Sequence, residues 1–204
     1  MAQIKLTKTE LRSQQVRLDQ LKKYLPTLQL KKALLQVEVF QAQQEIEDLT
    51  IHFGRMEERV KRFSVLLSDK NASDLFSAVT VVEVKKRVEN IAGVEIPYFE
   101  EVVFHEPTYS LFDTPVWMEP ATEGVRELIN IREKIRIARE KKTALENELR
   151  EVSIRVNLFE KILIPRAQEN IKKIKIFLGD VLLAAVSQAK VSKQKILKKK
   201  AASS

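Results

Sequence analysis

Apolar residues recur at alternating steps of three and four from Leu11 to Leu67. Of the 17 positions in this series, 15 are apolar, and the exceptions are Gln14 and Lys32. This is the heptad pattern of a coiled-coil helix, some 57 residues or roughly 85 Å long. The series comprises Leu11, Leu18, Leu21, Leu25, Leu28, Leu35, Val39, Ala42, Ile46, Leu49, Phe53, Met56, Val60, Phe63 and Leu67. So long an apolar seam requires an equally long partner helix.

A second heptad seam in the C-terminal third supplies that partner. It contains Leu128, Ile131, Ile135, Ala138, Leu145, Leu149, Val152, Val156, Phe159 and Leu163, with Lys142 as its polar exception. After Leu163 the series shifts to Ala167, Ile171, Ile174, Leu178, Val181 and Ala185. Such a four-residue insertion, or stutter, locally relaxes a supercoil. We therefore expect two antiparallel helices in one chain.

Each helix contains one internal proline, which removes a backbone hydrogen bond and bends a helix. If the chain folds back so that Leu67 faces residue 124, the numbers of facing residues add to about 191, and Pro26 faces Pro165. This register predicts a bend shared by the two helices. It also predicts that the last twenty residues extend, without a partner, past the start of the first helix.

The segment between the helices has a different pattern, with β-branched runs on both sides of Gly93. We expect strands at 80–91 and 94–104, a turn at Ala92 and Gly93, and a short helix at 71–78 capped by Ser73. The predicted fold is mainly α: a long antiparallel intramolecular coiled coil with a small α/β-hairpin insert. Its expected parts are the N-terminal helix 1–67, the insert 68–120, the C-terminal helix 121–190 and a basic tail 191–204.

Charge is unevenly distributed along the chain. The formal net charge is +8. Each helical segment, 1–67 and 121–187, contributes +4, the insert 68–120 contributes −6, and residues 188–204 contribute +6. The basic tip includes Lys193, Lys195, Lys198, Lys199 and Lys200. Without this tail the remaining net charge is +2, which gives little support for nucleic-acid binding. The absence of cysteine and of any long uncharged apolar stretch favours a cytoplasmic protein that does not cross a membrane.

The residues that usually carry catalysis are scattered. The four glycines stand singly, so there is no phosphate-binding loop, and His52 and His105 have no ligand-spaced partners. We therefore expect no catalytic site, no metal site and no cofactor.

The segment RVNLFEKILIPRAQENIKKIKIFLGD, residues 155–180, resembles the C-terminal helix of the D subunit of V-type ATPases, in their bacterial branch. The opening LTKTELRSQQVRLDQLKKYL and the ENIAGVEIP turn at 89–97, with Asn90, Gly93 and Pro97, extend the resemblance over nearly the whole chain. The residues that carry the C-terminal match include Arg155, Asn157, Phe159, Glu160, Pro165, Gly179 and Asp180. The stretch 24–39, with its proline, departs from the more basic sequence of many members.

The resemblance implies a central rotor subunit that transmits torque between the A/B hexamer and the membrane rotor. Its implied partners are the A, B, F and C subunits of the complex, at a cytoplasmic position peripheral to the membrane. The alternatives are a free-standing coiled-coil scaffold or adaptor and, with less support, a basic nucleic-acid-binding protein.

Overall fold

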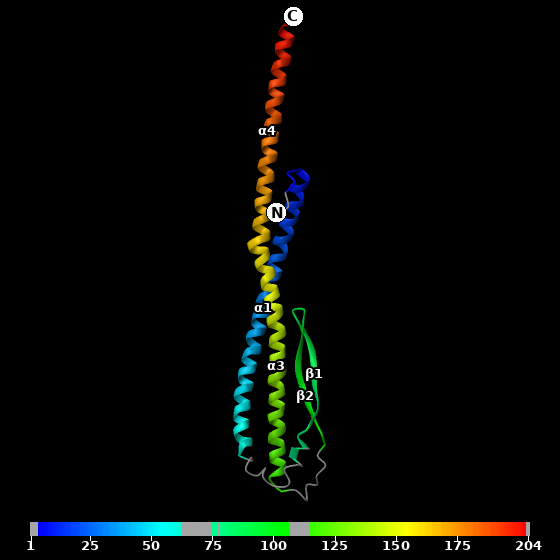
Figure 1. Cartoon of the computed structure of the whole chain (residues 1–204), viewed down its shortest axis with the longest axis vertical. Helices are drawn as coiled ribbons and strands as arrows, with labels where there is room; N and C mark the ends of the chain where they lie inside the picture. The colour runs from blue at the N-terminus through cyan, green and yellow to red at the C-terminus, as the bar shows by residue number, and fades with distance from the viewer. Residues whose placement is uncertain (1–3, 63–74, 77, 107–114, 203–204) are drawn as a thin grey trace. The chain divides into compact units, whose positions relative to one another are not determined.

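The computed structural model describes residues 4–62, 75–76, 78–106 and 115–202, with side chains as far as residue 198. Its elements are α1 (Lys8–Lys61), β1 (Val81–Ile91), β2 (Val94–Phe104), α3 (Met118–Leu158), the π-helix η2 (Phe159–Leu163) and α4 (Ile164–Ala202) (Figure 1). The predicted fold class is confirmed: long N- and C-terminal helices form an antiparallel coiled coil, with a two-stranded hairpin between them in sequence. Two compact units are present, one of Lys31–Val152 and one of Met1–Leu30 with Ser153–Ser204.

The start of α1 follows the expected capping chemistry. The backbone N–H of Glu10 donates to Oγ1 of Thr7 over 3.2 Å, which satisfies one of the four unpaired donors at a helix start. Every described position of the first seam, from Leu11 to Val60, is buried or half-buried, and so are the two polar exceptions. Phe63 and Leu67 lie outside the described residues, as does most of the expected helix at 71–78, including Ser73.

In the unit Lys31–Val152, α1 packs along α3. One core cluster contains Met56, Ile131 and Ile135, and Leu49, Phe53 and Leu128 pack around it. Near its start, α3 approaches α1 closely, since a Cβ at Gly124 would lie 3.2 Å from Cγ2 of Val60. Pro120 falls in the first turn of α3, where its missing N–H would have no helical partner in any case.

The register between α1 and α3 differs from the expected one. The numbers of facing residues were expected to add to 191. Lys31 pairs with Glu148, and their numbers add to 179, which is 12 fewer; Glu45 pairs with Lys141, and their numbers add to 186, which is 5 fewer. Val60 and Gly124, which approach each other closely, have numbers that add to 184, seven fewer than expected. The heptad repeat explains this error, because sliding one helix by seven residues preserves the apolar seam. A bend shared by Pro26 and Pro165 therefore stays a prediction, but the register no longer supports it.

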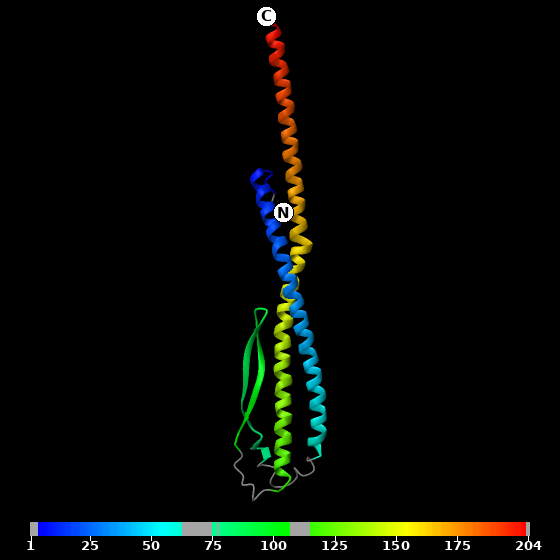
Figure 2. The same ribbon diagram turned by 180° about the vertical axis from the view of Figure 1, so that it is seen from behind.

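The hairpin agrees closely with the sequence prediction. β1 and β2 pair antiparallel from Val81 opposite Phe104 to Ile91 opposite Val94, with two irregularities along the ladder. Ala92 and Gly93 have φ values of 52° and 84°, the left-handed pair that a two-residue hairpin turn requires. Figure 2 shows the hairpin alongside α3.

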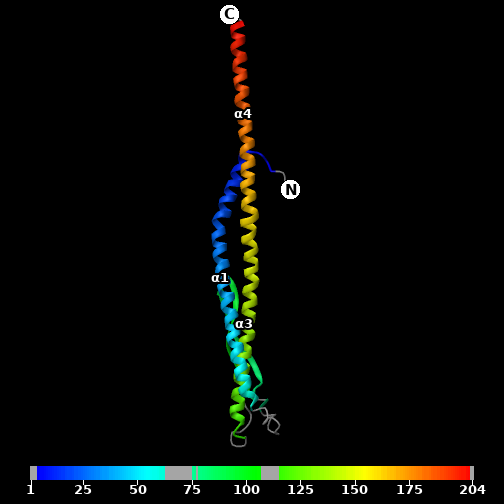
Figure 3. The same cartoon turned by 90° about the vertical axis from the view of Figure 1, so that its left-hand side faces the viewer.

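In the other unit, the N-terminal part of α1 packs against η2 and α4. The buried and half-buried positions of α4 end at Leu178, and every side chain from Gly179 to Lys198 is exposed. Figure 3 shows α4 continuing past the beginning of α1, as expected, and the helix extends to Ala202.

The two internal prolines have different surroundings. Pro26 lies within an uninterrupted α1. Pro165 is the second residue of α4, next to the cap residue of η2, Ile164, whose N–H donates to the carbonyl of Phe159, five residues earlier. The π-helix thus occupies the point at which the sequence predicts a stutter.

Candidate partner-binding surfaces

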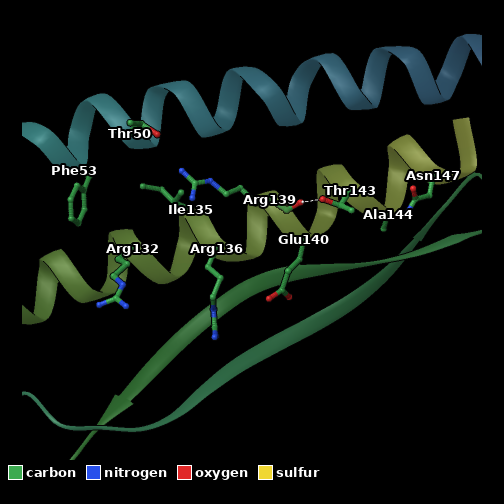
Figure 4. Close-up of a pocket in the computed structure, with 10 residues that line it drawn as sticks. All are labelled: Thr50, Phe53, Arg132, Ile135, Arg136, Arg139, Glu140, Thr143, Ala144 and Asn147. Carbon is green, nitrogen blue, oxygen red and sulfur yellow. Dashed lines mark hydrogen bonds between the residues drawn. The ribbon is translucent and has the colours of Figure 1, made fainter. Parts of the chain in front are cut away.

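A groove of about 910 Å³ lies on the unit Lys31–Val152. α1 contributes Thr50 and Phe53, and α3 contributes Arg132, Ile135, Arg136, Arg139, Glu140, Thr143, Ala144 and Asn147 (Figure 4). Arg139 extends toward α1, whereas Arg136 and Glu140 extend toward the hairpin side of α3. The groove combines an apolar surface from Phe53, Ile135 and Ala144 with a row of guanidinium groups.

The charge of this groove is only partly compensated. Nη2 of Arg136 lies 2.7 Å from Oε2 of Glu133, and Glu140 binds Nζ of Lys86 over 2.7 Å. Among the described residues, Arg132 and Arg139 have no ion-pair partner. The surface is therefore suited to acidic groups of another protein. The sequence signal, arginines three and four residues apart in IREKIRIARE, was present, but it lies outside the seam and was missed.

The predicted hairpin residues define the turn and its flank. The side-chain Oδ1 of Asn90 accepts a hydrogen bond of 3.0 Å from the N–H of Gly93, and Pro97 is half-buried opposite Val88. A Cβ at Gly93 would lie 3.7 Å from Nζ of Lys31 in α1. The turn thus lies beside the coiled coil.

Three cations of α3 lie over aromatic rings of β2. The distances to the ring centres are 5.1 Å from Arg126 to Phe104, 5.3 Å from Lys134 to Phe99 and 4.4 Å from Lys141 to Tyr98. Arg126 also donates to the carbonyl of Ala78 from Nε and Nη2, over 3.0 and 2.7 Å, and to the carbonyl of His105 over 3.2 Å. These long side chains bind the hairpin, and the residues Ala78 and His105 on either side of it, to α3.

Lys141 is the most buried of these cations, at 8% exposure. Burial alone would lower its pKa, but the charge and hydrogen bond of Glu45, together with Tyr98, outweigh burial and raise the pKa of Lys141 above its usual value. Its Nζ lies 3.3 Å from Oε2 of Glu45. Lys141 is therefore an ammonium ion held between α1, α3 and the hairpin.

The exposed end of α4 combines two kinds of surface. Large apolar side chains are exposed at Val181, Leu182, Leu183, Val186, Val191, Ile196 and Leu197. Lys193, Lys195 and Lys198 of the predicted basic tip are exposed on the same stretch, whereas the side chains of Lys199 and Lys200 lie outside the described set. An apolar surface of this kind indicates contact with another macromolecule.

A polar hollow of about 430 Å³ lies where α1 meets η2 and α4. Gln14, the first polar seam position, donates to Glu10 over 2.8 Å and lines this hollow together with Asn170, which is 9% exposed. Asn170 occupies a buried position that the sequence pattern assigned to its neighbour Ile171, which is only half-buried. Polar residues in a coiled-coil seam restrict its register.

Neither a metal-binding cluster nor a membrane span occurs in the described part of the chain. His52 and His105 are exposed and lie on α1 and after β2. No group of three or more acidic, histidine or cysteine side chains within the described ranges could hold a metal ion. None of the described helices is long and apolar enough to cross a membrane.

The residues of the C-terminal sequence match lie along three consecutive elements. Arg155 and Asn157 are on α3, Phe159 and Glu160 on η2, and Pro165, Gly179 and Asp180 on α4. Phe159 is half-buried and the other six are exposed. The matched segment thus contains both seam positions and exposed positions suited to outside contacts.

These features define a class: an intramolecular coiled-coil protein with a docked hairpin and an exposed helical end, suited to assembly with other proteins. The sequence profile of the family of ATP synthase D subunits matches residues 10–194. The chain is 42% identical to the D subunit of the V-type ATP synthase of Chlamydia abortus, over 98% of this chain and 96% of the relative. It is 44% identical to the D subunit of the V-type ATP synthase of Chlamydia trachomatis serovar L2, over 96% of this chain and 97% of the relative. The chain belongs to this family of ATP synthase D subunits, in its V-type branch.

Proposed function

We propose that this chain is the non-catalytic central rotor shaft of a V-type ATPase or ATP synthase. In this role it transmits torque between the nucleotide-dependent A/B hexamer and the ion-translocating membrane rotor, at the cytoplasmic face of the membrane. Family membership supports the assignment to the complex. The observation that carries the shaft role is α4, which remains helical while all its side chains from Gly179 to Lys198 are exposed.

The exposed end of α4 suits the interior of a ring of subunits. Its apolar residues would be costly on a free surface, at about 25 cal/mol for each Å² of apolar area left in water. We assign this end to the A and B subunits and the lysines to a soft electrostatic bearing contact. A shaft must also resist slippage of one helix past the other, and the long seam of α1 and α3 provides that resistance.

We assign the arginine groove to the F subunit, and we assign the end of the coiled coil at which Val60 of α1 approaches Gly124 of α3 to the C subunit. The groove's two uncompensated guanidinium groups and its apolar surface fit a partner segment that carries both acidic and apolar side chains. The hairpin, next to this groove through the Lys86–Glu140 pair, is assigned either contact with F or a regulatory effect on hydrolysis.

Co-purification with the hexamer subunits is the decisive experiment for the assembly. The full chain, expressed with the A, B and F subunits, should elute as one complex and should be monomeric when expressed alone. A chain that self-associates through its seam and captures none of these subunits would instead be a scaffold, and the proposal would be rejected.

Two deletions test the parts of the shaft separately. Removing residues 188–204 should weaken hexamer association or coupling, and an unchanged ATPase rate with normal assembly would remove the tail from the mechanism. Replacing residues 80–104 with a short linker should impair F binding or alter turnover. Full F binding with normal turnover would reject the role of the hairpin.

Charge reversal tests the groove. Replacing Arg132 and Arg139 with glutamate should weaken F binding by about ten-fold or more, because repulsion replaces attraction at the interface. The matched control is Lys22→Glu, at an exposed position of α1 that does not line the groove, which should leave F affinity within about two-fold. Equal effects of the two changes would refute the groove assignment.

A further inference from the structure

Three cations of α3 form one row that faces the hairpin. Arg126, Lys134 and Lys141 are eight and seven residues apart, a spacing that places them on the same face of a helix. Their ring partners follow in the order Phe104, Phe99 and Tyr98, which is the reverse order along the chain. β2 therefore runs antiparallel to α3, and one cation holds each successive part of the strand.

The hairpin buries apolar surface through β2, which is buried or half-buried at eight of its eleven positions, and hardly at all through β1. Ile96 is the one fully buried side chain of β2, and all but three of the eleven residues of β1 are exposed. An isolated two-stranded hairpin is only marginally stable in water. The order of this hairpin thus depends on its contacts with the coiled coil, which include the apolar side chains of β2, the cation–aromatic row and the ion pair of Lys86 with Glu140.

Lys141 differs from the other two members of the row, because it also reaches α1. Its Nζ lies 3.3 Å from Oε2 of Glu45, and the same ammonium group lies over the ring of Tyr98. Within the described residues, Glu45 makes no ion pair or hydrogen bond with the hairpin. A buried ammonium ion that loses its charged partner is strongly unfavourable, so Lys141 cannot stay in place if Glu45 moves away.

We propose that Lys141 is a positioning residue that couples the docking of the hairpin to the packing of α1 against α3. A displacement of α1 along α3 draws Glu45 away, the ammonium group turns toward water, and Tyr98 loses its cation. Detachment of the hairpin conversely opens the Lys141–Glu45 pair to water and weakens it. Such coupling is reciprocal by thermodynamic necessity. It depends on contacts within this chain and does not require the proposed rotor role.

Hydrogen–deuterium exchange of the full-length chain tests this coupling. In Lys141→Met, the backbone amides of β1 and β2 should exchange at least about 30-fold faster, while those of α1 and α3 change by less than about three-fold. In Glu45→Gln, the hairpin amides should exchange about ten-fold faster, although Glu45 does not bind the hairpin. Lys141→Arg, which keeps the charge and can stack on Tyr98, should remain within about three-fold of the unaltered chain.

Lys142→Met is the matched control. Lys142 is the neighbouring cation of α3 and pairs over 3.3 Å with Glu146 of the same helix, so its loss should change hairpin exchange by less than about two-fold. Unchanged hairpin exchange in Glu45→Gln would overturn the coupling, even if Lys141→Met released the hairpin. Equal acceleration in the hairpin and in α1 and α3 would also overturn it, because Lys141 would then be only a residue of the general core. If Lys141→Met does not fold, Glu45→Gln and Lys141→Arg still decide between these outcomes.

Discussion

Leu35→Ala measures how much one layer of the seam contributes to stability. The side chain of Leu35 is 0% exposed, so the substitution removes apolar groups that are fully withdrawn from water. Three carbon groups at about 0.8 kcal/mol each give roughly 2.4 kcal/mol, and the cavity left behind adds to this value. We expect the free energy of unfolding to fall by about 2.5–4 kcal/mol. For a chain of this size, about 3 kcal/mol corresponds to a decrease of roughly 6–12 °C in Tm.

The adjacent leucine provides the control for this measurement. Leu34 is 50% exposed on the same helix, so Leu34→Ala makes the same chemical change with the same helix propensity but without opening a buried cavity. Its effect should be about 0.5 kcal/mol or less. Unfolding by urea and by heat, followed by the helical circular dichroism signal at about 222 nm, measures the free energy of unfolding and the Tm of both variants. If the two substitutions destabilise the chain equally, or if Leu35→Ala costs less than about 1 kcal/mol, the placement of the seam is refuted.

Three further predictions follow from the backbone and charge of particular residues. Gly93→Ala should destabilise the hairpin by about 1 kcal/mol, because φ at this residue is +84°. Gly179→Ala, in a helix with open space around it, should stabilise α4 by about 0.5–1 kcal/mol. Hydrogen–deuterium exchange should become faster in the hairpin of the first variant and slower in α4 of the second. Pro165→Ala permits a hydrogen bond to the carbonyl of Lys161, but the seam beyond it still needs the wider turn, so η2 and the Cα chemical shifts at 159–163 should stay as they are. Conversion of these shifts to ordinary α-helical values together with a gain in stability would contradict the link between η2 and the stutter. The pKa of Lys141 is raised above 10.5 in the folded state, so the contribution of its charge to stability should be complete below that pH and lost as pH rises through the higher folded pKa. The Tm difference between the unaltered chain and Lys141→Met should therefore shrink only above about pH 10.5. A loss of this Tm difference near neutral pH would contradict the assignment.

The sequence predicted those parts of the fold that depend on local periodicity. The 3–4 spacing identified every described seam position of α1, because burial of a helix face requires no knowledge of the partner. Ala92 and Gly93 located the turn to the residue, because a two-residue hairpin needs positive φ at both positions. The register of α1 against α3 was wrong, because heptads are interchangeable and the ion pairs that distinguish them, such as Lys31–Glu148, involve residues 117 positions apart.

The binding surfaces were less predictable for the same reason. The exposed end of α4 followed from the expected register of the two helices and is long enough to survive the error in that register, and the lysines of its tip were evident from the sequence. The groove and the row of cations over β2 were not predicted. Whether Lys141 faces Tyr98 and Glu45 depends on how three elements are aligned, and neither hydrophobic pattern nor charge along the chain contains that alignment.

The stutter and Pro165 both require the helix to change its winding at the same place. The phase of the apolar pattern changes between Leu163 and Ala167, and a straight α-helix would turn the later seam residues away from α1. A proline at 165 forbids the ordinary hydrogen bond to Lys161 and crowds the carbonyl of that residue. The turn just before it widens to bonds five residues long, so the helix rotates less per residue there and carries Ala167 and Ile174 to buried positions. Proline therefore does not interrupt the seam; it stands at the point where the helix must change its winding for the seam to continue.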